Sequence, residues 1–387
     1  TMPTHEDQSC LLDLMSRMGS QGRAEGEDAA GLRRTFLPVP EHMRAFDPDV
    51  VLVVGPRGAG KTELFRTVIE QGLLPLLSAR IPGVRLPPLG STAWLSGYSS
   101  RGTDFPSEPQ FRVFLLQRPA TDELFLDLWL AYLLRVLKDQ IQDPSLGRIF
   151  APQGGDLEGV LAAYRGNTKT ALLALDALDG RLDREDRFVF VGYDELDTLA
   201  RNDPDLTRVA VRGLVALWAG HSRRWKRVRG KIFLRSDLYE RAATAGGADF
   251  AKLAANRAEI AWSDRHLLAM LVRRLANSGD DLRRYAEKSR IGLEDGGDLG
   301  LFPLIARADD ARPLIERMVG PYMGAGHKKG EAFRWVLDHI RDGRRQALPR
   351  PLVRLFEAAA ELQKASGTWP RWPRRCPTLK SSATAGT

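Results

Sequence analysis

The segment Gly55–Thr62 carries residue types, at a spacing, that could hold the phosphates of a nucleotide. Its glycines let the backbone turn tightly, so that several N–H groups can converge on an anion. Lys61 can reach the β- and γ-phosphates, and the Thr62 hydroxyl can ligate Mg²⁺. The spacing predicts a nucleotide site with contacts from Gly55, Pro56, Arg57, Gly58, Ala59, Gly60, Lys61, Thr62 and Glu63.

The flanks of this segment are those that a phosphate-binding loop requires. Val50–Val54 is a short continuous apolar run, which is typical of a buried parallel strand. Glu63–Glu70 is predicted to be a helix, whose positive N-terminal end would face the same anion. A strand, a G-x-x-x-x-G-K-T loop and a helix in this order predict a P-loop; a Gly-rich turn that happens to hold a lysine is the alternative.

A second set of candidate residues follows another apolar strand, Arg187–Val191. The chain then reaches Asp194 and Glu195, two consecutive carboxylates. An acidic residue after a second strand helps to hold Mg²⁺ in P-loop enzymes, and this is the predicted role of Asp194. Glu195 would polarise the attacking water, because hydrolysis needs a group that orients and deprotonates it. The pair favours ATP hydrolysis with bound Mg²⁺; a surface turn is the alternative.

The elements that must position these residues alternate between strands and helices, and then become helical only. This order predicts an α/β domain followed by a helical one. Beyond Ser263 we expect strand character to disappear. The expected strands are Val50–Val54, Thr92–Leu95, Arg187–Val191, Lys231–Leu234 and Ala258–Trp262, and the expected late helices are His266–Ala276, Asp281–Lys288, Ala311–Met318, Glu331–Ile340 and Pro351–Gln363.

The P-loop, the strand before Asp194-Glu195, the strand before Arg235-Ser236-Asp237 and the helical region resemble the AAA+/STAND branch of P-loop ATPases. The resemblance covers residues 47 to 365, in order of elements. It implies an α/β fold: a parallel-sheet P-loop NTPase core with helices on both faces, followed by an α-helical lid domain, with a winged-helix-like form of that domain as an option. Bacterial signalling or anti-phage defence is the setting that it implies.

Three arginines have roles that only this resemblance implies. Arg235 would contact the γ-phosphate and report its loss, unless Ser236 or Asp237 fills the polar role; a strand-end salt bridge is the alternative. Arg350, at the start of a lid helix, would reach over the nucleotide. Arg257 is the candidate for an arginine finger toward a neighbouring subunit.

Composition limits the remaining possibilities. The 387 residues carry a formal net charge of +8 and only two cysteines, one near each end. We find no disulfide framework, zinc spacing, signal peptide or membrane-spanning stretch, which favours the cytoplasm. A basic run could contact nucleic acid, although such runs are more often solvated surface; it comprises Arg223, Arg224, Lys226, Arg227 and Arg229.

We expect four regions along the chain. They are a flexible segment at 1–40, an ATPase core at 41–262 with an insert at 91–186, a helical lid at 263–367 and a disordered tail at 368–387. Within the insert, the Gly/Ser/Pro-rich stretch Ser96–Pro109 is predicted to be a surface loop that could recognise a partner.

The leading prediction is an ATPase that acts as a nucleotide-driven switch or motor for a partner protein or within a homo-oligomer. One alternative is a DNA-associated ATPase whose helical C-terminal region contacts nucleic acid. The other is a nucleotide-gated scaffold with little turnover. The six histidines show no metal or catalytic spacing, so we assign the effector chemistry to another protein.

Overall fold

The computed structural model describes residues 12–16, 29–100, 105–116, 118–153, 155–200, 203–244, 247–323, 327–343 and 345–366. Both cysteines, the predicted tail and most of the predicted N-terminal segment lie outside these residues. The chain divides into two compact units. The sheet unit contains Pro40–Arg57 and Leu64–Ile260, and the helical unit contains the residues up to Val39, Gly58–Glu63 and the residues from Ala261 onward. The division near residue 260 lies close to the predicted one, but part of the P-loop groups with the helical unit.

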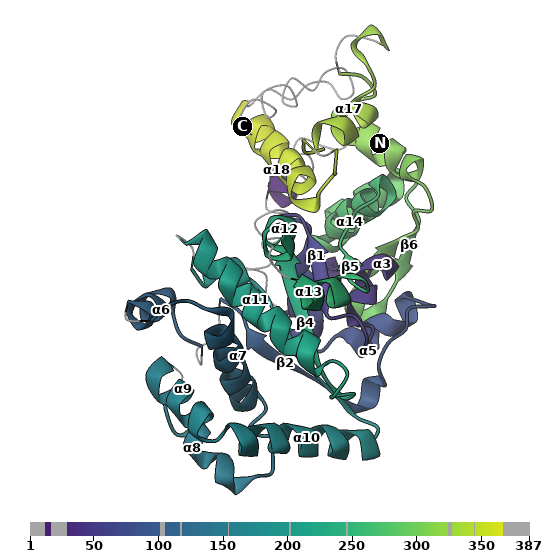
Figure 1. Ribbon diagram of the computed structural model, residues 1–387. Helices are drawn as coiled ribbons and strands as arrows, with labels where there is room; N and C mark the ends of the chain where they lie inside the picture. Colours follow the sequence, from purple (N-terminus) through teal and green to yellow (C-terminus); the bar gives the residue numbers. More distant parts are fainter. Residues whose placement is uncertain are drawn as a thin grey trace. The chain divides into compact units, whose positions relative to one another are not determined.

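Five parallel strands form the centre of the sheet unit, in the order β2-β3-β4-β1-β5. Figure 1 labels β1, β2, β4 and β5. Every predicted strand is present, with shifted ends. This order places β1 between β4 and β5 and aligns Gly55 with Arg235. The strands are β1 (Leu52–Gly55), β2 (Thr92–Tyr98), β3 (Phe188–Tyr193), β4 (Val228–Arg235) and β5 (Ala258–Glu259).

Helices cover both faces of this sheet. On one face the Phe65 ring, at the end of α4 (Lys61–Phe65), lies edge-on to Phe233 at 5.6 Å. A π-helical segment, Arg66–Glu70, continues α4 over the same face. Successive side chains of a strand point to opposite faces of a sheet. Tyr193 lies on the face opposite to Phe233. Its ring meets aromatic rings of α7 (Asp122–Val136) and α11 (Pro204–His221), those of Trp129 at 5.6 Å and Trp218 at 6.3 Å.

The segment between β2 and β3 is a helical insert. The prediction that Ser96–Pro109 is a surface loop is wrong in part, because β2 continues to Tyr98 and the Phe105 ring packs 4.6 Å from that of Tyr132. Deleting this segment would remove core side chains. Residues 101–104 lie outside the described residues. The insert helices are α6 (Glu108–Leu115), α7, α8 (Gly147–Phe150), α9 (Leu157–Gly166) and α10 (Thr168–Arg184); short helices elsewhere in the unit are α3 (Pro40–Met43), α5 (Leu74–Leu77), α12 (Ser236–Thr244) and α13 (Gly247–Ala254).

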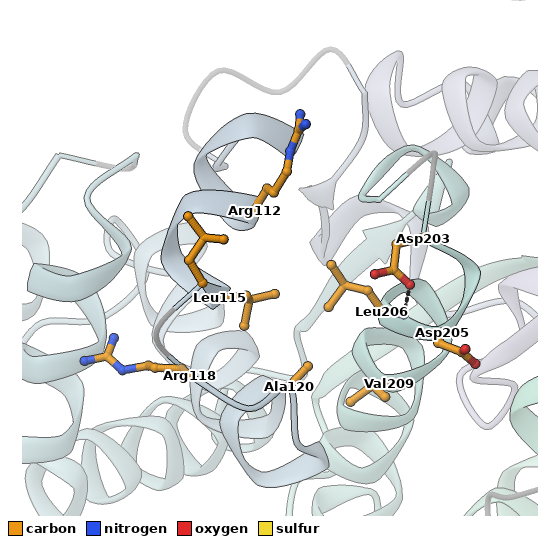
Figure 2. Close-up of a pocket in the computed structure, with 9 residues that line it drawn as sticks. Arg112, Leu115, Arg118, Ala120, Asp203, Asp205, Leu206 and Val209 are labelled. Atoms are coloured by element: carbon orange, nitrogen blue, oxygen red, sulfur yellow. Dashed lines mark hydrogen bonds between the residues drawn. The ribbon is translucent and has the colours of Figure 1, made fainter.

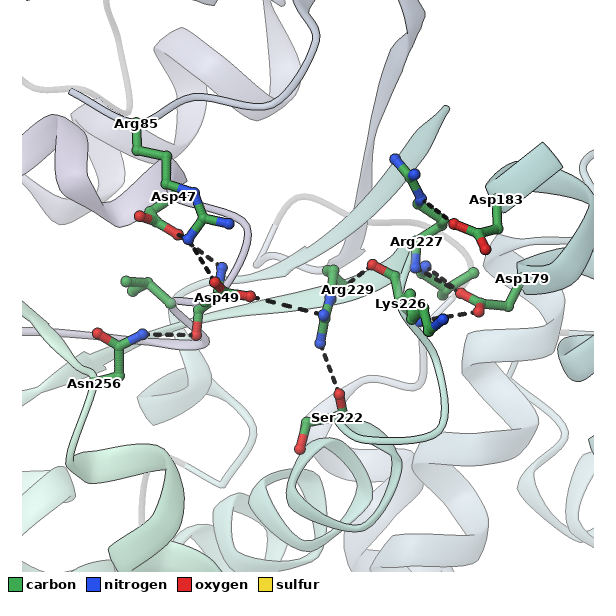
Figure 3. Close-up of polar contacts among 12 residues, drawn as sticks. Asp47, Asp49, Arg85, Asp179, Asp183, Ser222, Lys226, Arg227, Arg229 and Asn256 are labelled. Carbon is green, nitrogen blue, oxygen red and sulfur yellow. Dashed lines mark hydrogen bonds and ion pairs between the residues drawn. The ribbon is translucent and has the colours of Figure 1, made fainter. Parts of the chain in front are cut away.

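A row of carboxylates joins α10 to the loop that precedes β4; Figure 3 shows its Asp179 and Asp183 contacts. Asp176, Asp179 and Asp183 follow one another at three- and four-residue steps, which places them on one helix face. Asp176 binds the Arg224 guanidinium, and Asp183 accepts from Arg227 Nε at 2.8 Å. We call these three aspartates, with residues 224–228, the aspartate clasp.

Asp179 is the buried centre of the clasp. Its side chain is 7% exposed and accepts the backbone N–H groups of Lys226, Arg227 and Val228 at 2.9, 2.7 and 2.9 Å. The three N–H groups stabilise the negative charge of the buried carboxylate, and the carboxylate in turn gives each backbone donor an acceptor. The turn into β4 is therefore fixed by a residue of the insert.

Replacing Asp179 with Ala is expected to destabilise the protein by about 3 kcal/mol, because three backbone donors lose their acceptor. Asp183→Ala is the matched control, since this aspartate lies on the same helix but its side chain is 42% exposed. An exposed ion pair contributes about 1 kcal/mol or less. Urea unfolding measures both changes; equal destabilisation by the two variants would contradict the central role of Asp179.

Lys231 is a fully buried lysine in the central strand β4. Its ammonium group donates to the carbonyls of Asp47 and Val50, next to the start of β1, and lies 5.0 Å from the Phe190 ring centre. Burial lowers the pKa of Lys231 from 10.5 to about 7, with Arg229 acting in the same direction and the Asp47 and Asp49 carboxylates opposing it. The folded protein thus holds this proton more weakly than the unfolded chain does.

This difference predicts a pH dependence of stability. Above pH 7 the folded state loses the Lys231 proton while the unfolded state keeps it, so the contribution of Lys231 to the unfolding free energy rises with pH until about 10. The slope is at most about 1.4 kcal/mol per pH unit. We expect the wild type to gain stability relative to a Lys231→Met variant between pH 7 and 9, measured by urea unfolding. A pH-independent difference would contradict the lowered pKa.

The helical unit is built around α14 (Asp264–Asn277), which Ser263 caps by accepting the His266 N–H at 3.2 Å. The expectation that strands disappear after Ser263 is wrong, because two three-residue strands form an antiparallel hairpin. The other elements are α2 (Ala29–Thr35), α15 (Asp280–Lys288), the hairpin strands β6 (Leu293–Asp295) and β7 (Leu301–Pro303), α16 (Arg312–Val319), α17 (Ala332–His339) and α18 (Pro349–Ser366).

A buried arginine ties this unit together. Arg273 of α14 is fully buried and donates to the carbonyls of Phe36, Leu299 and Leu301 at 2.7–2.8 Å, and to that of Arg33 at 3.2 Å. These bonds join α14 to α2 and to the hairpin. Part of the segment predicted to be flexible, residues 29–39, is therefore ordered against the helical unit.

Candidate nucleotide-binding site

In the sheet unit, several predicted residues lie at one edge of the sheet. β1 ends at Gly55, β4 ends at Arg235, and Asp194 directly follows β3. The carboxyl ends of parallel strands form one edge, where α/β proteins bind their ligands. Asp194 is 2% exposed, and its backbone N–H donates to the Tyr98 carbonyl at 2.9 Å.

Glu195 has a left-handed backbone conformation, with φ 55° and ψ 31°. This region is costly for a residue with a side chain, and such residues concentrate at functional sites. The Glu195 carboxylate accepts hydrogen bonds from the backbone N–H (3.2 Å) and the hydroxyl group of Ser100, which follows β2. Two strand ends therefore fix the position of the carboxylate.

Arg235 is held by two carboxylates. Its guanidinium donates to Asp197 at 2.8 Å and to both oxygens of Asp237 at 2.9 and 3.1 Å. Burial acts to lower the pKa of Arg235, but the bonds to Asp197 and Asp237 outweigh it and leave the pKa raised. The arginine is thus firmly charged and bridges the end of β4 to the loop that carries Glu195.

The part of the P-loop in the helical unit has the backbone of a phosphate cradle. Gly58 and Gly60 have φ of 84° and 93°, a conformation that side chains rarely adopt. Helical structure begins at Lys61, which is 8% exposed, so the helix starts two residues earlier than predicted. Thr62 is the second residue of this helix. Successive N–H groups in such turns converge on anions.

Three side chains from later in the helical unit lie beside Gly58–Glu63. The Trp262 indole N–H donates to the Ala59 carbonyl at 2.8 Å. A Cβ at Gly58 would lie 3.5 Å from the Cβ of Arg350, so the structure brings this predicted residue beside the loop. Arg274 Nη2 donates to Glu63 Oε1 at 2.9 Å. The sequence predicted a strand that ends at Trp262 and a helix that contains Arg274, but it did not reveal their partners at Ala59 and Glu63.

Arg257 is placed differently from the other candidates. It precedes β5, whose Ala258 aligns with Val53 rather than with the end of β1. Its guanidinium donates to Glu259 at 2.8 Å and to the Ala254 carbonyl at 3.1 Å. A role as an arginine finger would require these bonds to open.

A groove of about 390 Å³ in the sheet unit is lined by none of the predicted nucleotide residues. Figure 2 shows the side chains that line it. The groove lies between α6 and the start of α11. Its floor is apolar, with Leu115, Leu206 and Val209, and Arg112 and Asp203 stand at its rim.

A parallel sheet covered by helices on both faces, with a P-loop after β1 and a helical C-terminal region, defines an α/β P-loop NTPase core. No protein-family model matches the chain, and no curated protein matches it. Among solved structures, the chain is similar to the Aeropyrum pernix ORC2 protein, described as ADPNP–ADP complexes. The identity is 17%, the match covers 98% of this chain and 67% of that chain, and the TM-score is 0.34. A likeness this weak carries no functional argument.

Over the described ranges, no three His, Cys, Asp or Glu side chains cluster as a metal site. Mg²⁺ does not require such a cluster, because it is bound by one or two carboxylates together with waters and substrate phosphates. The hydroxyl of Thr62 and the carboxylate of Asp194 are oxygen donors of the kind that Mg²⁺ prefers. Within the described chain, every helix is too short or too polar to cross a bilayer.

Proposed function

We propose that this protein binds ATP with Mg²⁺ and hydrolyses it. The observation that carries the proposal is the P-loop itself, in which positive-φ glycines at 58 and 60 lead directly into a helix that begins with Lys61. Neither position tolerates a side chain without strain, and the turn they form is suited to an anion. The carboxylates after β3 extend the proposal from binding to hydrolysis.

Each residue has a defined part in this proposal. Lys61 pairs with the β- and γ-phosphates, and Thr62 and Asp194 hold Mg²⁺, which supplies charge neutralisation on the phosphates when bound. Glu195 orients the attacking water and takes its proton. Arg235 and Arg350 respond to the γ-phosphate. For Arg235 this would mean exchanging a carboxylate partner for a phosphate oxygen.

Calorimetric titration tests nucleotide binding directly. The protein is titrated with ATP and with ADP, in Mg²⁺ and in EDTA, and phosphate release is followed in parallel. We expect saturable binding of both nucleotides, tighter ATP binding in Mg²⁺, and phosphate release only in Mg²⁺. Absence of binding at millimolar nucleotide would rule out the proposal.

We further propose that hydrolysis drives a switch that acts on a partner protein or between copies of this chain in the cytoplasm. The support is the resemblance to AAA+ and STAND-like ATPases, which also suggests bacterial defence or signalling. Size-exclusion chromatography with light scattering, with ATP and with ADP, tests whether assembly follows the nucleotide state. An Arg257→Ala variant that retains full activity in the assembled state would remove the arginine-finger role.

The DNA-associated alternative was motivated in part by the basic run, and three residues of that run take part in contacts within the sheet unit. Within the basic run, Arg224 and Arg227 are paired with aspartates of the clasp, and Arg229 donates to the Ser222 carbonyl at 2.8 Å (Figure 3 shows Arg227 and Arg229). These bonds give Arg224, Arg227 and Arg229 a structural part in the sheet unit. DNA binding that weakens steeply with salt would favour the alternative, because phosphate contacts release counterions, and absence of such binding would remove it.

A further inference from the structure

A buried charge lies beside the P-loop without a part in the proposed chemistry. Arg274, on α14, has a side chain that is only 4% exposed, and it donates to Glu63 at 2.9 Å. The Glu63 side chain is itself only 18% exposed. An ion pair this far from water contributes little net stability, since desolvation offsets the attraction. The position of Glu63 in the chain points to a role for this ion pair other than stability.

Glu63 directly follows Lys61 and Thr62 and lies in the first helical turn after the cradle. A carboxylate in a first turn favours the helix itself. The same negative charge opposes the binding of phosphates at the loop that it follows. The repulsion grows with the charge of the ligand. It therefore weakens the binding of ATP more than that of ADP, and it does not affect the binding of adenosine.

We propose that Arg274 neutralises Glu63 and thereby sets how strongly the P-loop prefers ATP over ADP. This inference rests on the proposed nucleotide binding at the same loop. Arg274 is a positioning and charge-compensating residue that acts through Glu63. The Trp262 bond to the Ala59 carbonyl supports the arrangement, because it holds that carbonyl in place from the residue that precedes the cap of α14. The same helical unit thus fixes both the backbone and the charge of the loop.

Two single variants with opposite expected signs test the proposal. Arg274→Gln leaves Glu63 without its arginine partner and should weaken ATP binding about tenfold, ADP binding less, and adenosine binding hardly at all. Glu63→Gln leaves the arginine charge in excess and should strengthen ATP binding severalfold with adenosine unchanged. The double variant should return the ratio of ATP to ADP affinity close to that of the wild type. Calorimetric titration of the full chain with the three ligands gives these affinities.

The matched control is Arg341→Gln, which breaks another ion pair of the helical unit, to Asp264 at 2.8 and 2.9 Å. It should leave the ratio of ATP to ADP affinity unchanged. Equal losses for ATP, ADP and adenosine, or weaker ATP binding in both single variants, would show a purely structural pair and overturn the proposal. Should Arg274→Gln not fold, the sign of the Glu63→Gln change decides alone. A wild type that binds no nucleotide would instead refute the proposed function.

Discussion

A Glu195→Gln variant is expected to bind ATP as tightly as the wild type and to hydrolyse it about 100- to 10,000-fold more slowly. Glutamine preserves the size of the side chain and can still accept the hydrogen bonds from Ser100. It cannot take a proton from water. Single-turnover phosphate release, with protein in excess over ATP, isolates the chemical step from product release.

Glu185→Gln is the control for this experiment. This glutamate precedes β3 at the opposite end from Glu195, and its exposed side chain pairs with Arg187 at 2.9 Å. Its removal should leave turnover within about twofold, because an exposed pair contributes little. A wild type that turns over no faster than Glu195→Gln would replace the ATPase proposal with the nucleotide-gated scaffold.

A Lys61→Ala variant is expected to lose ATP affinity by about 100-fold or more, because a buried phosphate partner is worth roughly 3 kcal/mol or more. Lys61 is 8% exposed and begins the helix after the cradle. Titration with ATP measures the loss, and thermal unfolding without nucleotide shows whether the fold survives.

Lys138→Ala is the matched control, since this lysine is exposed and lies just beyond α7. It removes the same charge from the chain and should leave ATP affinity unchanged. Equal effects of the two variants would mean that net charge, and not the P-loop lysine, governs binding.

The elements closest to the predicted chemistry were also the easiest to predict. β1 and β3 are continuous apolar runs, and such a run is the sequence pattern typical of a buried parallel strand. The hairpin strands β6 and β7 have three residues each, too few to show an alternating pattern. Glycine and serine around Tyr98 and Phe105 suggested a loop, although both aromatic rings pack into the core. Local composition therefore concealed a tertiary contact.

The candidate site likewise depends on tertiary contacts that the sequence does not reveal. The motif located Lys61, Thr62, Asp194 and Glu195 along the sequence, because their spacing follows from strand ends and turns. The pairing of side chains could not be predicted in this way, because Arg274 and Glu63 are separated by 211 positions and meet only in the folded chain. The left-handed backbone of Glu195 likewise has no local signal, because it depends on what surrounds the strand end.

The aspartate clasp has a consequence for protein engineering. Asp179 of the insert accepts hydrogen bonds from three backbone N–H groups of the turn into β4. The insert and that turn can therefore be exchanged only together. A chimaera that grafts the segment between β2 and β3 from another protein would have to transfer residues 224–228 with it. Without them, the graft would leave either orphaned aspartates on the helix or orphaned donors beside the sheet.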